Sequence, residues 1–299
     1  MEQCPIKEME ILFECVQDTE NSLFEPIPAK KVRPEWFKKL PMNVDNYGES
    51  VETIKKCPAM QDWMNMGYLI RNRHTILVVL SPKKAEPLYQ PTSIAFALRD
   101  DIPKDKFKKL KQFVVDYNRN YSLDNLDKIV AYCKENYLLI EELQDNYVVG
   151  GHPAAQSRGS GYDDKMAFKF KVDFLITTPK GTSTYWLDPF LFNNPYFHAW
   201  QGIIDTDSFN QLTTNNMCIF YPKADNSFII PKGTPIVQVV PFVRYPWKHK
   251  IEYLDREEIL NRMQHPVVKV LEKRGVGENK IKEHEHFYRK NLANKKEFK

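Results

Sequence analysis

The chain has 299 residues, of which 42% are hydrophobic and 13% aromatic, enough apolar mass to build a folded core. The 43 basic and 39 acidic residues are interspersed and give a formal net charge of +4, which lends no support to nucleic-acid binding. Composition therefore excludes wholesale disorder, while the length allows either one elaborated domain or two packed domains.

The five cysteines are scattered and form no CxxC pair, which indicates neither a disulfide framework nor a zinc knuckle. The N-terminus carries Glu2, Glu8 and Glu10 where a signal peptide would be basic. No apolar run approaches the roughly 18 residues that a membrane-spanning helix requires. We therefore expect a cytoplasmic protein that does not enter a membrane.

Residues 1–100 are predicted to form a β-rich part of the core, crossed by a proline-rich strap. EILFECV, at Glu10–Val16, predicts a buried strand. The segment PIPAKKVRPEWFKKLP follows, and its prolines hold the chain extended, with a single helical turn around Trp36, Phe37 and Leu40.

A short helix is predicted at Pro58–Gly67, because proline stands near its start and glycine at its stop. Its Met60, Trp63 and Met64 stripe indicates core packing. Tyr68–Ile70 and Thr75–Leu80 are rich in aliphatic and β-branched residues and predict strands.

Residues 101–150 are predicted to be a helical insertion. The stretch from Lys104 to Asn146 contains no proline or glycine and shows a 3.6-residue apolar period, which predicts two helices. Ser122 is the expected N-cap of the second helix. Because the pair separates two β-rich regions, we expect it to lie on one edge of the sheet.

Residues 151–247 are predicted to form an antiparallel β-domain, with its clearest part from Lys165 to Phe242. The glycine-rich segment Gly150–Asp164 predicts a long loop. After it come short alternating segments closed by Pro, Gly or Asn, which is typical of an all-β barrel or sandwich. Residues 248–299 are expected to be a helical tail, with an amphipathic helix from Tyr253. The expected class is thus mainly β with helical additions, α+β.

Two motifs resemble a known family. GIIDTD at Gly202–Asp207 and IPKGTPIVQVVPF at Ile230–Phe242 resemble the third and fourth motifs of dUTPases and dCTP deaminases. TPKGTSTYWLDP at Thr178–Pro189 resembles the strand that enters their second motif. The resemblance implies a dUTPase-like β-clip core and a homo-oligomer, with a trimer as the common form in that fold.

The resemblance also implies site residues. Asp205 matches the aspartate that orients or deprotonates the attacking water, a role suited to a positioned carboxylate. Gln238 matches a glutamine near the subunit interface, and Phe209 lies close to the position of an aromatic that stacks on deoxyribose. Asp207 is a further candidate ligand residue, and Asp188 with Asp205 and Asp207 could cluster around a divalent ion or simply cap turns.

The catalytic motifs depart from the family. DPFLFNNP, at Asp188–Pro195, stands where the family has P-R-S-S and supplies neither its arginine nor its serines. KRGVG at Lys273–Gly277 only faintly resembles the glycine-rich tail that closes over the triphosphate. Because a triphosphate needs several such donors or a metal, the motifs point to binding without catalysis.

Other chemistry is weakly indicated. His152 and Arg158, in the glycine-rich loop, could cover an anionic ligand. His284 and His286 make a poor metal chelate, since residues i and i+2 of a helix point apart, so no metal site is predicted.

The arrangement of PIPAKKVRPEWFKKLP, TIKKCPAMQDWMNMGYLI and GIIDTD also resembles an uncharacterised group of phage and bacterial proteins. The leading hypothesis is a phage-type accessory protein, in the host cytoplasm, that binds a protein partner or a nucleotide. An alternative is a divergent dNTP hydrolase with Asp205 as general base, for which Mg²⁺ would be the expected cofactor. A third is a structural virion or assembly protein.

Overall fold

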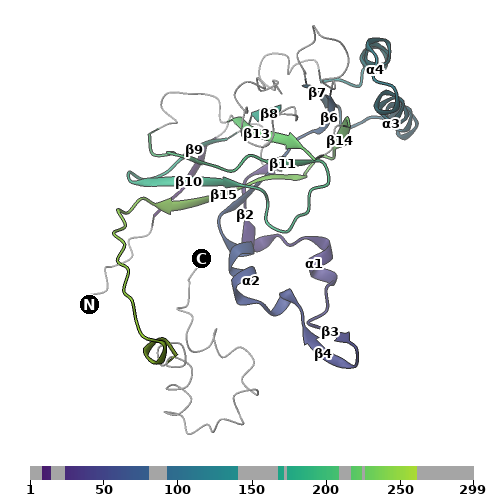
Figure 1. The fold of residues 1–299 in the computed structure, drawn as a ribbon. Helices are drawn as coiled ribbons and strands as arrows, with labels where there is room; N and C mark the ends of the chain where they lie inside the picture. The colour runs from purple at the N-terminus through teal and green to yellow at the C-terminus, as the bar shows by residue number, and fades with distance from the viewer. Residues whose placement is uncertain are drawn as a thin grey trace.

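A computed structural model describes residues 9–14, 24–80, 93–140, 168–171, 174–208, 217–223 and 226–260 (Figure 1). Within these residues the chain combines helices with antiparallel sheets, so the predicted α+β class is confirmed. No helix in these ranges has the length and apolar character needed to cross a membrane.

The largest sheet has five antiparallel strands in the order β12-β10-β15-β5-β2. Their bounds are β12 Gly202–Ile204, β10 Thr182–Leu187, β15 Pro235–Val243, β5 Tyr68–Arg71 and β2 Ile27–Pro28. The central strand β15 pairs with β10 on one side and with β5 on the other. Strands from the first hundred residues and from the predicted β-domain therefore share one sheet.

A three-stranded sheet, β14-β6-β7, explains the unbroken apolar run TILVVL. It comprises β14 Phe228–Ile230, β6 Thr75–Leu80 and β7 Ser93–Leu98. Leu77 and Val79 of β6 pack in one core cluster, and the alternate residues of the strand pack in another. Successive side chains of a strand point to opposite faces, so a strand that is buried on both faces needs apolar residues throughout.

Two further sheets complete the body: β11-β13-β8 and β1-β9. Their strands are β11 Phe197–Ala199, β13 Met217–Pro222, β8 Phe168–Lys171, β1 Leu12–Glu14 and β9 Leu175–Thr177.

The prediction that Glu10–Val16 contains a buried strand is correct about the strand and wrong about its burial. The strand exists as β1, but it pairs only with β9, and Leu12 is exposed. Ile11 and Phe13 are partly buried against the main core, and the Phe13 ring lies 4.9 Å from that of Tyr68.

The main core lies between the five-stranded sheet and the sheets that face it. Trp186 of β10 and Val239 of β15 meet Val78 of β6, Ile230 of β14 and Phe197 of β11 in one buried cluster. This cluster fixes the ends of β10 and β11, from which the candidate site is built.

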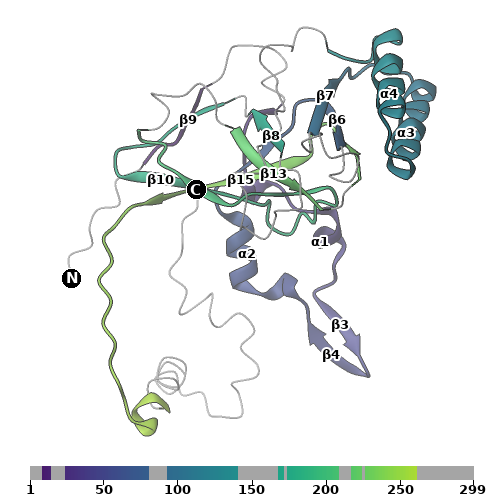
Figure 2. The ribbon, with the colours of Figure 1, turned by 45° about the horizontal axis from the view of Figure 1, so that its top comes forward.

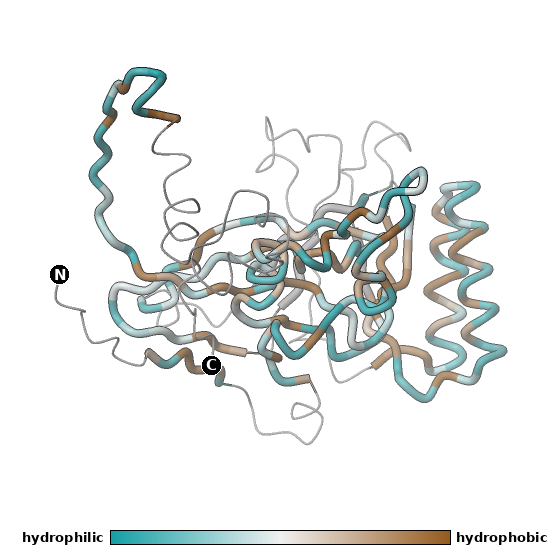
Figure 3. Tube along the Cα trace, turned by 90° about the horizontal axis from the view of Figure 1, so that it is seen from below, coloured by the Kyte–Doolittle hydropathy of each residue, from teal (hydrophilic) through white to brown (hydrophobic). Residues whose placement is uncertain are grey.

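The two predicted helices are present as α3 Lys104–Arg119 and α4 Leu123–Glu135. Ser122 caps α4 as expected, since its hydroxyl accepts a hydrogen bond from the Asn125 N–H. Apolar bands recur along both helices in Figure 3, and Leu110 and Ile129 pack onto the β6 side chains. The pair therefore covers a face of the β14-β6-β7 sheet, and its predicted position on a sheet edge is wrong.

Helices α1 Glu35–Lys39 and α2 Pro58–Asn65 confirm the predicted turn and short helix. Gly67, just after α2, has a φ of +66°, and a Cβ there would lie 2.1 Å from the carbonyl oxygen of Val239. Only glycine lets the chain leave α2 and enter β5 this close to β15.

Two features project from the body (Figures 1 and 2). One is a two-stranded hairpin of β3 Asn43–Asn46 and β4 Glu49–Glu52, which the sequence does not predict. The other is the chain after β15, which has no regular structure until a helix begins at residue 256. That helix starts after the predicted Tyr253 because the Asp255 carboxylate accepts a hydrogen bond from the Glu258 N–H at 2.8 Å, as an N-cap does.

Candidate functional site

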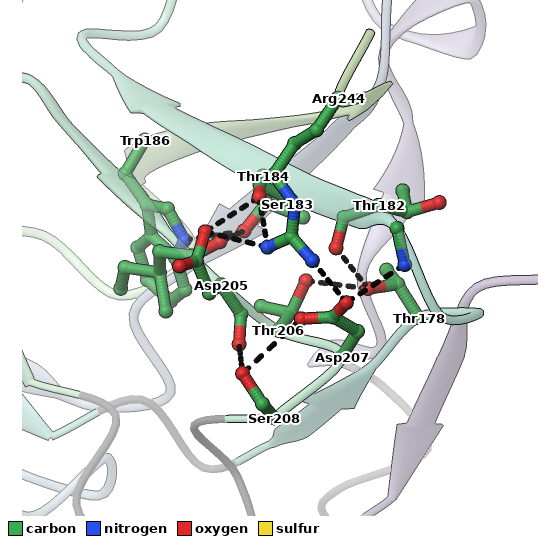
Figure 4. A network of polar contacts seen from close by, with 12 residues as sticks. Thr178, Thr182, Ser183, Thr184, Trp186, Asp205, Thr206, Asp207, Ser208 and Arg244 are labelled. Carbon is green, nitrogen blue, oxygen red and sulfur yellow. Dashed lines mark hydrogen bonds and ion pairs between the residues drawn. The ribbon is translucent and has the colours of Figure 1, made fainter. Parts of the chain in front are cut away.

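Asp205, the leading sequence candidate, lies in the turn after β12, and 57% of its side chain is exposed. Ser183 donates its hydroxyl hydrogen to Asp205 Oδ1 at 2.6 Å, and Arg244 Nη1 lies 2.8 Å from the same oxygen (Figure 4). Ser183 belongs to β10, which lies between β12 and β15, and Arg244 directly follows β15. The sheet order thus brings together three residues that are far apart in the sequence.

Asp207, in contrast, is 5% exposed in its side chain. Its Oδ2 accepts a hydrogen bond from the Gly181 N–H at 2.8 Å and also pairs with Arg244 Nη2. The buried hydroxyl of Thr206 lies 2.7 Å from that of Thr178. The turn that carries both aspartates is therefore fastened at several points (Figure 4).

The charges of this network compensate one another. The Ser183 hydrogen bond, followed by Arg244, lowers the pKa of Asp205. The Gly181 N–H, followed by Arg244, lowers the pKa of Asp207. The two carboxylates in turn raise the pKa of Arg244. A carboxylate with a lowered pKa is a weaker base, so this geometry suits a structural clamp better than water activation.

The other predicted residues are not gathered around Asp205. Gln238 is 2% exposed and lies inside the molecule, where its Oε1 accepts from the Phe190 N–H at 3.0 Å and its Nε2 donates to the Met66 carbonyl at 2.7 Å. Phe209, His152 and Arg158 lie outside the described residues.

Metal binding gains no geometric support in the described ranges. No group of three or more His, Cys, Asp or Glu side chains there is arranged to hold a metal ion. Asp188 does not join Asp205 and Asp207, because its carboxylate is bound to His198.

A pocket of about 400 Å³ lies beside the segment 188–194. Apolar side chains form part of its lining, among them Trp63, Phe190 and Phe197. Polar groups also reach it: Asp188, Asn193, Asn194, His198, Gln201 and Lys223. A concave site of this size, with aromatic walls and a few convergent polar groups, is typical of a small-molecule site.

His198 and Asp188 form an oriented pair at this pocket. Asp188 follows β10 and His198 lies in β11, and His198 Nδ1 is 2.9 Å from Asp188 Oδ2. The other oxygen, Oδ1, accepts a hydrogen bond from the Ala199 N–H at 2.5 Å, which fixes the carboxylate. A carboxylate at Nδ1 favours the tautomer that leaves Nε2 as an acceptor, and Nε2 has no hydrogen-bond partner among the described residues.

The pocket segment holds an unusual backbone. Leu191 and Asn193 have positive φ angles of 61° and 47°. For leucine this conformation costs about 1–2 kcal/mol. It is held by the Trp36 Nε1–H, which donates to the Leu191 carbonyl at 2.8 Å, and by the Gln238 contact to Phe190. Strained backbone that its surroundings enforce concentrates at functional sites.

The sequence does not identify His198, Lys223 or Arg244 as site residues, and it treats Trp63 only as core. Their partners are distant in the chain: ten residues separate Asp188 from His198 and 37 separate Asp207 from Arg244. The only local signal at the pocket is the pair of prolines, Pro189 and Pro195, which marks a long turn.

Neither a protein-family model nor a curated protein matches this chain.

Proposed function

We propose that the chain is a phage-type accessory protein that binds a nucleoside or a nucleoside monophosphate in the pocket beside residues 188–194 and does not hydrolyse it. The observation that carries this proposal is the convergence of aromatic walls, the oriented His198–Asp188 pair and Lys223 in one pocket of about 400 Å³. A pocket of that size suits a nucleoside-sized ligand.

The aromatic side chains suit a planar base. The rings of Trp63 and Phe190 lie 5.6 Å apart in an edge-to-face arrangement, which holds the Trp63 ring in place. Each base that stacks on an aromatic side chain gains about 1–3 kcal/mol. The side-chain amides of Asn193, Asn194 and Gln201 carry donors and acceptors that match the hydrogen-bonding edge of a base.

The positive charge at the pocket suits a single phosphate. Among the described residues that line the pocket, Lys223 is the only lysine or arginine. A triphosphate requires several such donors or a metal to balance its charge. The pocket therefore favours a monophosphate or an uncharged nucleoside over a dNTP.

The β-clip interpretation belongs to this proposal. It is supported by the placement of the resembling motifs: GIIDTD forms β12 and the turn after it, the PIVQVVPF part of the second motif lies in β15, and β10 lies between these strands. Hydrolysis by Asp205 is not proposed, because Ser183 and Arg244 both bind its Oδ1 and lower its pKa, which makes the carboxylate a weaker base.

Isothermal titration with nucleosides, nucleoside monophosphates and dNTPs tests the proposal. We expect saturable binding of a nucleoside or its monophosphate, and at least tenfold weaker binding after Trp63→Leu, from the loss of stacking. His198→Ala should weaken the binding of both ligands, because it removes the Nε2 acceptor from the pocket. Leu123→Ala is the control, since Leu123 is exposed and lies outside the pocket lining.

Two results would count against the proposal: no binding of any member of the panel, or binding that Trp63→Leu and His198→Ala leave unchanged. Turnover of a dNTP with Mg²⁺ that Asp205→Asn abolishes would instead establish the hydrolase alternative.

A further inference from the structure

The segment after β15, residues 245–254, is here called the arm. It carries four large side chains that are between 69% and 94% exposed: Tyr245, Trp247, Ile251 and Tyr253. Its backbone makes no hydrogen bond with another described segment. Apolar side chains that gather on one exposed segment mark a surface that binds a partner.

The arm has the pattern of an unpaired β-strand. Its exposed apolar residues stand at alternate positions, 245, 247, 251 and 253, with His249 at the position between the two pairs. The intervening positions hold Pro246, Lys248, Lys250 and Glu252. In an extended chain this alternation gives one apolar face and one mainly basic face.

The β3–β4 hairpin lacks a third strand among the described residues. Val44 pairs with Val51, and both are exposed, as is Met42 two residues before Val44. The opposite face is formed by the pairs Asn43–Glu52 and Asp45–Ser50. An isolated two-stranded hairpin is only marginally stable in water, and a third strand with an apolar face would stabilise it.

Charge makes the arm and the hairpin complementary. The hairpin contains Asp45, Glu49 and Glu52 and no lysine or arginine. Asp45 and Glu52 lie on its polar face, where Glu52 pairs with Lys56, and the arm carries Lys248 and Lys250 on its own polar face, where Lys250 pairs with Glu252. When the apolar faces are aligned in one sheet, the lysines come to the same side as the carboxylates, and opposite charges on neighbouring strands attract.

Both features project from the same side of the body, but the arm and the hairpin lie well apart in Figures 1 and 2. We propose that the arm of one copy adds as a third strand to the β3–β4 hairpin of a second copy of this chain. Strand addition of this kind uses main-chain hydrogen bonds for affinity and alternate side chains for specificity. The contact is independent of the ligand pocket, because none of the arm or hairpin residues lines it.

Complementation between two variants of the full chain tests the contact. The arm variant is Trp247→Ser with Tyr253→Ser, and the hairpin variant is Val51→Lys, which places a cation on the apolar face. Leu123→Ser, at an exposed position of α4, is the control. Sedimentation velocity over a concentration series measures the self-association of each protein, and circular dichroism verifies that each is folded.

We expect the wild type and the Leu123→Ser control to self-associate, and each of the two variants to associate at least tenfold more weakly. An equimolar mixture of the two variants should associate more strongly than either alone, because an intact arm then meets an intact hairpin. A monomeric wild type, an arm variant that associates normally, or a mixture that gains nothing would each overturn the proposal.

Discussion

Gln238 is the side chain whose removal should most clearly uncouple the pocket segment from the rest of the fold. It lies in β15 and is 2% exposed. Its amide joins two separate pieces of chain, the Phe190 N–H at 3.0 Å and the Met66 carbonyl at 2.7 Å. Gln238→Leu keeps a similar volume and removes both hydrogen bonds, together with a longer one of 3.4 Å from Nε2 to the Trp63 carbonyl, so it isolates their contribution.

The expected loss follows from the two partners left behind. A buried donor or acceptor that loses its partner costs about 1–3 kcal/mol, so Gln238→Leu should lower the free energy of unfolding by about 2–6 kcal/mol. Gln238→Ala should cost more, because it also leaves a cavity. Gln112→Ala is the matched control, because its hydrogen bond to Asp116 is exposed, and it should change stability by less than about 0.5 kcal/mol.

Urea denaturation followed by circular dichroism measures these differences, and ligand titration on the same variants reports on the pocket. Gln238→Leu should weaken binding even where the protein remains folded, because Phe190 then loses its anchor. A Gln238→Leu protein within about 0.5 kcal/mol of the wild type would refute this reasoning, since neighbouring water or backbone would then be satisfying both groups.

Three further perturbations have directions that the structure fixes. Gly67→Ala should lower the free energy of unfolding by more than about 3 kcal/mol or prevent folding. Gly181 also has a positive φ, but a Cβ there would have nothing within 4 Å, so Gly181→Ala should cost about 1 kcal/mol. Urea denaturation compares the two variants. Burial raises the pKa of the Cys133 thiol to about 11, so the thiol of the unfolded chain ionises first. The free energy of unfolding should therefore fall by roughly 3 kcal/mol between about pH 9 and 11, and Cys133→Ala should remove this slope in pH-dependent unfolding. The lowered pKa of Asp207 makes stability fall toward acid pH instead. The ionised Asp207 stabilises the fold at neutral pH, and this stabilisation is lost as the pH falls below about 4. Asp207→Asn should therefore flatten the acid end of a profile of melting temperature against pH.

Each of these three predictions can fail visibly. Equal costs for the two glycine variants would mean that β15 moves aside from residue 67. If the fall in stability at alkaline pH persists in Cys133→Ala, other titrating groups must cause it. An acid profile unchanged by Asp207→Asn would mean that Arg244 contributes nothing to folding through this carboxylate.

Local chemistry predicts much of the fold because neighbouring residues decide it. The unbroken TILVVL run, the Ser122 cap, and the proline and glycine that bound α2 all act within a few residues, and each has the predicted structure. The hairpin β3–β4 escapes prediction because most of its residues are polar. Its exposed turn instead uses Tyr47 and Gly48, both with positive φ.

The candidate site is less predictable, because tertiary contacts create it. Asp205 stands out in the sequence, but its ion pair depends on Arg244, which lies beside it because β10 pairs with β15. The pairing of His198 with Asp188 likewise needs the turn between β10 and β11. A single sequence shows which residue types are present and not which of them meet across sheets.

The proposed stacking of a nucleoside or nucleoside monophosphate against Trp63, in the pocket beside residues 188–194, can be observed directly. Its most direct test is a titration of the full chain with nucleosides and nucleoside 5′-monophosphates, followed by tryptophan fluorescence in the wild type and in Trp63→Phe. We expect saturable quenching of the fluorescence in the wild type and no such quenching in Trp63→Phe. Absence of quenching, or quenching of equal size in Trp63→Phe, would contradict it.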